Sequence, residues 1–216
     1  MLTTFGYDLT GGILVILATA RTDQVAWRFL RLTGFLVLAL SCGLTTWNVL
    51  HPPTASSASH TIMVIAGILS GGCGAALALL APWSDRHPSA YRMLTLLGGW
   101  AGVGAGILHE SAALRTGPVP LGILLPVLIV SHAAAALLTG SITVTWLLGH
   151  AYLTATRMTI APLRHFTRLV AWSLTLRAIL LPILLLLGWW IAGRAGGTDP
   201  TPFTTPGLTA ALVNDW

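Results

Sequence analysis

Long apolar runs with very little charge are the feature that most constrains the fold of this chain. A helix that crosses a lipid bilayer needs about 20 mostly apolar residues. Six candidate runs cover residues 6–20, 32–50, 61–83, 93–113, 119–149 and 169–193. Only 8% of the 216 residues are charged, against roughly a quarter in soluble domains. We therefore predict an all-α integral membrane protein, a bundle of about six transmembrane helices with short loops.

The two ends of the chain depart from this pattern. Asp8 interrupts the approach to the run at 6–20, so this is the weakest of the six helix predictions, and the segment could instead lie in the interface between water and lipid. The C-terminal end is rich in Gly, Thr and Pro, which is typical of an extended, mobile segment. We expect a six-helix transmembrane domain over residues 1–194 and a flexible, non-cytoplasmic tail over residues 195–216.

The positive charges predict an orientation. All 11 cations are arginines, and short cytoplasmic connections of membrane proteins carry the excess of basic residues. The connections after the first, third and fifth runs hold eight of them, and the opposite side holds two, Arg115 and Arg194; the eight are Arg21, Arg28, Arg31, Arg86, Arg92, Arg157, Arg164 and Arg168. We expect a multi-pass protein of a bacterial inner membrane with both termini non-cytoplasmic. The arginines then face anionic lipid head groups, so a nucleic-acid partner is not expected.

Glycines predict which helices approach closely. Membrane helices associate through small residues that let their backbones touch. Such residues recur in two neighbouring runs; they are Gly67, Gly71 and Gly74 in the first and Gly98, Gly102 and Gly106 in the second. We predict close packing between the helices at 61–83 and 93–113.

Two ionisable residues fall deep within apolar runs, where such groups are costly and are functional candidates by default. They are His132 and Arg177. No carboxylate is expected at their depth, because the acidic residues lie in loops or near helix ends; they are Asp8, Asp23, Asp85, Glu110, Asp199 and Asp215. Arg177 would then be satisfied by helix carbonyls, water, neutral His132, another subunit or an anionic group such as a haem propionate or lipid phosphate. Alternatively, it would extend toward the head groups. The lack of carboxylates also argues against a carboxylate-driven pump.

A second histidine-containing cluster is expected at the cytoplasmic rim. His150 lies 18 residues after His132, so both would project from one face of a continuous helix. His150 and His165 flank the short connection that carries Arg157 and Arg164. Histidine beside arginine suits a quinone head group or a haem, whereas contact of a basic rim with phospholipid is the more common arrangement.

Histidines also gather toward the opposite rim. His51, His60 and His109, together with Glu110, contain the ligand types of a metal site. Their spacing matches no metal-binding motif, and we expect an ordinary solvated loop with no metal.

These observations favour a non-catalytic membrane subunit of a larger complex. We expect a respiratory or electron-transfer assembly in which His132, Arg177, His150 and His165 hold or neighbour a haem b or a quinone. Its partners would be the lipid bilayer and other membrane subunits. One alternative is a small-molecule transporter that uses helices kinked at Pro126 and Pro182, and another is a membrane-embedded enzyme that modifies lipids.

Overall fold

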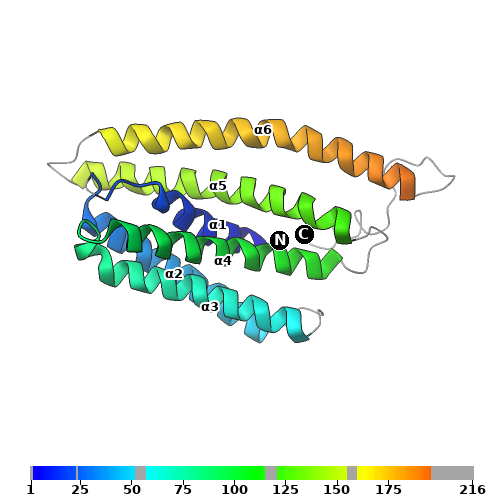
Figure 1. Cartoon of the computed structure of the whole chain (residues 1–216), viewed down its shortest axis with the longest axis horizontal. Coiled ribbons are helices and arrows are strands. Elements are labelled where there is room, and N and C mark those ends of the chain that lie inside the picture. The colour runs from blue at the N-terminus through cyan, green and yellow to red at the C-terminus, as the bar shows by residue number, and fades with distance from the viewer. Residues whose placement is uncertain (1, 23, 52–56, 115–120, 155–159, 196–216) are drawn as a thin grey trace. The chain divides into compact units, whose positions relative to one another are not determined.

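The computed structural model describes residues 2–22, 24–51, 57–114, 121–154 and 160–195, and every regular element in these ranges is helical. Six α-helices and one short 3-10 helix follow each other along the chain (Figure 1). They are α1 (Leu2–Ala18), α2 (Trp27–Leu50), α3 (Ser57–Leu80), η1 (Ala81–Trp83), α4 (Pro88–Leu114), α5 (Leu121–Thr154) and α6 (Ala161–Ala195). The predicted tail lies almost entirely outside the described residues.

Four helical segments are long and apolar enough to cross a bilayer, which confirms the predicted all-α membrane bundle. They are Trp27–Leu50, His60–Trp83, Leu125–Tyr152 and Ala161–Trp190. Pro126 and Pro182 lie inside α5 and α6, and both helices continue through them. The remaining two helices, α1 and α4, are not among these four segments. Their contacts with the other helices show that they belong to the same bundle.

Helix α1 occupies the centre of the bundle, although it is the weakest of the sequence predictions. Ten of its 17 residues are buried, and it contacts α2, α3, α4 and α5 (Figure 1). Ile13, Leu14 and Leu17 are fully buried in the hydrophobic core. In the assembled bundle this segment is therefore an internal helix rather than one that lies along the interface.

Two adjacent glycines let α1 fit between its neighbours. A Cβ atom on Gly11 would lie 2.7 Å from the carbonyl oxygen of Gly99 in α4, and one on Gly12 would overlap the carbonyl group of Ala136 in α5. Gly140 of α5 likewise faces the backbone of Gly12. The backbones of α4 and α5 touch α1 at these points, so a side chain at either glycine would force the helices apart.

The predicted contact between α3 and α4 exists, but most of the glycines serve other pairs of helices. Gly71 and Gly74 of α3 face Ser41 and Val37 of α2, not α4. Gly102 of α4 faces Gly11 of α1. The G-x-x-x-G pattern identifies surfaces of close approach, and it does not identify the partner helix.

The connection from α1 to α2, the short η1 and the start of α6 lie at the same end of the bundle (Figure 1). We call this the arginine-rich end, because seven of the eight grouped arginines lie in or beside these segments; Arg157 falls outside the described residues. By its contacts the chain divides into residues 1–180 and residues 181–216. The described part of the second unit is the last portion of α6.

Candidate functional site

A histidine lies between two carboxylates inside the bundle. Nδ1 of His132 is 2.9 Å from Oδ1 and 3.0 Å from Oδ2 of Asp8. On the other side of the ring, Nε2 lies 3.1 Å from Oε2 of Glu110. Asp8 belongs to α1, Glu110 to α4 and His132 to α5, so three helices contribute one residue each. We call these three residues the triad.

The triad corrects the prediction that no carboxylate shares the depth of His132. Asp8 is in the second turn of α1 and Glu110 is close to the end of α4, as the sequence suggests. However, α5 has 34 residues and α1 has 17, and His132 lies about 16 Å along α5 from its first residue. A position deep in the long helix is thus level with positions near the ends of its shorter neighbours.

Close packing of the glycines sets the position of the triad. Asp8 is one helical turn before Gly12, and His132 is one turn before Ala136, which Gly12 touches. Gly106 lies opposite the pair, where a Cβ atom would be 3.1 Å from Oδ1 of Asp8 and 3.5 Å from Nδ1 of His132. Glycine at position 106 therefore leaves the space that the Asp8 carboxylate and the imidazole occupy. These glycines are the signal in the sequence that could have brought the three helices together.

The three side chains of the triad differ in exposure, and Glu110 is the most exposed of them. The side chain of His132 is 5% exposed and that of Asp8 is 7% exposed, whereas the side chain of Glu110 is 43% exposed. Glu110 thus reaches the surface of the chain, and the other two groups are enclosed. The triad forms a continuous polar connection from the surface to the interior.

The geometry also requires protons in the triad. Both ring nitrogens of His132 face carboxylate oxygens, and a carboxylate only accepts hydrogen bonds. Both contacts are hydrogen bonds when an imidazolium lies between two carboxylates, or when a neutral imidazole lies beside one protonated carboxyl group. The arrangement can hold a proton at either nitrogen of the ring, and a carboxyl group is next to each.

Arg177 approaches the same region from α6. Its guanidinium donates a hydrogen bond to the carbonyl oxygen of Ser131 over 3.0 Å and lies 3.4 Å from the Ser131 hydroxyl. Ser131 precedes His132 in the chain, so the positive charge is next to the triad. The helix carbonyl is one of the partners that can satisfy a guanidinium in a membrane.

The other histidines near the triad have separate partners. His109 shares a hydrogen bond of 2.7 Å with the hydroxyl of Thr3. His51 stacks on Trp47, and Nε2 of His60 lies 3.1 Å from the carbonyl oxygen of Asn48. Within the described ranges, no group of three or more His, Cys, Asp or Glu residues has the arrangement of a metal site.

The two histidines of the cytoplasmic-rim hypothesis lie in different surroundings. His150 is exposed and packs against Trp146, with ring centroids 4.5 Å apart. His165 is 3.3 Å from the hydroxyl of Thr19 and lines a pocket of about 160 Å³ together with Arg21 and Gln24. The shared-face spacing of His132 and His150 is realised on one continuous α5, but only His132 is buried. The cofactor-binding role of these residues stays a prediction.

No family model matches the chain, and no curated protein or solved structure matches it either.

Proposed function

We propose that this chain is a membrane subunit that transfers protons through Asp8, His132 and Glu110. The observation that carries the proposal is the position of His132 between two carboxylates inside a membrane bundle. Imidazole changes its charge near neutral pH and can accept a proton on one nitrogen while it releases one from the other. Chains of Asp, Glu and His inside membrane helices are typical of proton relays.

Glu110 supports this function because it gives the relay an opening. Its half-exposed carboxylate can exchange protons with the surface, and the enclosed His132 can pass them to Asp8. The arginine distribution predicts that this opening is on the non-cytoplasmic side.

Three buried hydroxyl groups offer a route beyond Asp8. The side-chain oxygens of Ser41, Thr45 and Ser70 are enclosed, and those of Ser41 and Ser70 have no hydrogen-bond partner within the described part of the chain. Buried hydroxyl groups of proteins are normally bonded, often to internal water. The hydroxyl groups of Thr45 and Tyr7 both lie close to Gly67. Tyr7 is the residue before Asp8 in the chain. We propose that water bound at these groups extends the relay between α1, α2 and α3.

The main competing function of the triad is structural. Ion pairs can hold helices in one arrangement without transferring anything, and α1 needs such positioning between α4 and α5. The two functions predict different results for substitutions that keep the shape of the side chain. Asp8→Asn and Glu110→Gln preserve hydrogen bonding but cannot carry a proton in the relay.

The test measures proton entry into lipid vesicles that contain the purified chain and a pH-sensitive dye, driven by a potassium diffusion potential. We expect flux in the wild type and a loss of about 100-fold in Asp8→Asn and Glu110→Gln, the low end for losing a positioned acid–base group. Asp85→Asn, which removes an exposed carboxylate at the arginine-rich end, serves as the matched control and should keep the flux. A wild-type protein without flux overturns the proposal, as do variants that lose only thermal stability.

A further inference from the structure

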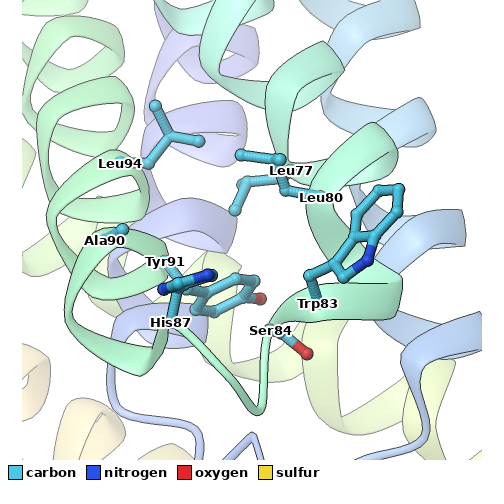
Figure 2. Close-up of a pocket in the computed structure, with 8 residues that line it drawn as sticks. All are labelled: Leu77, Leu80, Trp83, Ser84, His87, Ala90, Tyr91 and Leu94. Carbon is cyan, nitrogen blue, oxygen red and sulfur yellow. The ribbon is translucent and has the colours of Figure 1, made fainter.

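A pocket of about 110 Å³ lies at the arginine-rich end of the bundle, away from the triad. The end of α3, the short η1 and the start of α4 form it (Figure 2). Its lining residues are Leu77, Leu80, Trp83, Ser84, His87, Ala90, Tyr91 and Leu94. Tyr91 and Glu110 are 19 residues apart on α4, which separates the pocket from the triad by about 28 Å along this helix.

One polar group in this pocket is missing a partner. Tyr91 is 5% exposed, and its hydroxyl makes no hydrogen bond within the described residues. In Figure 2 this hydroxyl points into the space between Leu80, Trp83 and Ser84. Burial of an unbonded hydroxyl is unfavourable, and a ligand that accepts its hydrogen bond removes that cost.

The rest of the lining defines the chemistry of the ligand. Leu77, Leu80, Ala90 and Leu94 provide apolar contacts. The nearby Ser84 hydroxyl already donates to the carbonyl oxygen of Ala81 over 2.8 Å. Such a pocket suits a largely apolar group that carries a hydrogen-bond acceptor for Tyr91, and the His87 imidazole and the Trp83 indole N–H are further polar groups of the lining. A cavity of about 150 Å³ is known to accept a benzene ring, so this pocket suits about one ring or a short chain segment.

The residues at the mouth of the pocket are of the types found at a membrane surface, which favours a ligand that comes from the lipid bilayer. Trp83 is half exposed, and Trp residues favour the depth of the lipid head groups. Arg86 and Arg92 are close to the same segments in the sequence, which is typical of a membrane surface. With this rim at the depth of the head groups, apolar compounds dissolved in the bilayer would reach the pocket directly from the lipid.

We propose that this pocket binds the carbonyl group of an apolar membrane compound, with the Tyr91 hydroxyl donating a hydrogen bond to the carbonyl oxygen. Two classes of membrane compound carry such a carbonyl group: quinones, on the ring, and phospholipids, in the ester group. The proposal is independent of the proton relay, because it uses none of the residues of the triad.

The test measures binding to the full chain in detergent by the shift of its thermal transition. The probes are a benzoquinone with a short alkyl chain, a short-chain ester phospholipid and the ether-linked analogue of that phospholipid, which has no carbonyl group. We expect the quinone or the ester lipid to bind, and the ether lipid to bind at least about tenfold more weakly than the ester. Preference for the quinone or for the ester identifies the source.

Two variants test the contact itself. Tyr91→Phe keeps the ring and removes the donor, so we expect about tenfold weaker binding; Ala90→Trp fills the rim of the pocket and should abolish binding. Tyr152→Phe removes a phenol hydroxyl outside the pocket and serves as the control. Equal affinity of Tyr91→Phe and the wild type overturns the proposal, and so does a wild type that binds neither carbonyl probe. Equal binding of the ether and ester lipids, with no quinone binding, overturns it as well.

Discussion

Helices α1 and α6 show how little hydropathy says about position in a membrane bundle. In α1, a short helix with an acidic residue, most side chains are buried. The candidate span in α6 has a mean hydropathy of 2.1, yet only 6% of it is buried inside the chain. Lipid is as apolar as leucine, so apolar side chains gain little by leaving it for the interior of a protein. Small residues and polar partners place α1 at the centre, whereas the apolar surface of α6 stays exposed on the chain.

The largest difference between the two helices is expected when a small residue of each is replaced by leucine. Gly12→Leu forces a side chain into the backbone of α5, and we expect no folded protein. Ala171→Leu adds bulk to α6 at an exposed position and should leave the yield unchanged. Size-exclusion profiles in detergent measure both. Equal yields would place α1 outside the core.

A smaller effect is expected when a leucine is shortened in each helix. Leu14 is 0% exposed and Leu174 is 57% exposed. Leu14→Ala leaves a cavity in the core, and we expect it to lower the free energy of unfolding by about 2–5 kcal/mol. Leu174→Ala exchanges contacts with the surroundings only, so its effect should stay within about 0.5 kcal/mol. Thermal or denaturant unfolding in one detergent compares the two, and a similar loss for both would show that α6 is packed as tightly as α1.

The smallest effect on stability is expected from a substitution beside the triad. Gly106→Ala places a methyl group 3.1 Å from Oδ1 of Asp8, which must shift by a few tenths of an ångström, and in ordinary contact with His132. We expect a loss of about 1 kcal/mol in stability and a clear decrease in proton flux. Gly104→Ala is the control, because nothing lies within 4 Å of that glycine on the same helix. Unchanged flux in both variants would mean that the distance between Asp8 and His132 is not important for the relay.

The helices were largely predictable, because their boundaries follow from apolar runs. The run at 93–113, for instance, corresponds to α4 at Pro88–Leu114. The triad was not predictable in this way. Position along a helix gives depth only when helices have similar lengths and are level with each other, and α5 extends past α1. The sequence pattern therefore presents Asp8 as an interruption of a weak helix, although it is the partner of His132.

The central position of α1 has a consequence for the order of assembly. His132 lies 124 residues after Asp8 in the chain, and synthesis proceeds from the N-terminus. The carboxylate of Asp8 therefore meets the membrane before α4 and α5 have been made. Insertion of an unpaired carboxylate into lipid is costly, so we expect α1 to wait near the head groups until those helices arrive. On this expectation, α1 reaches its central position only after α4 and α5 are in place.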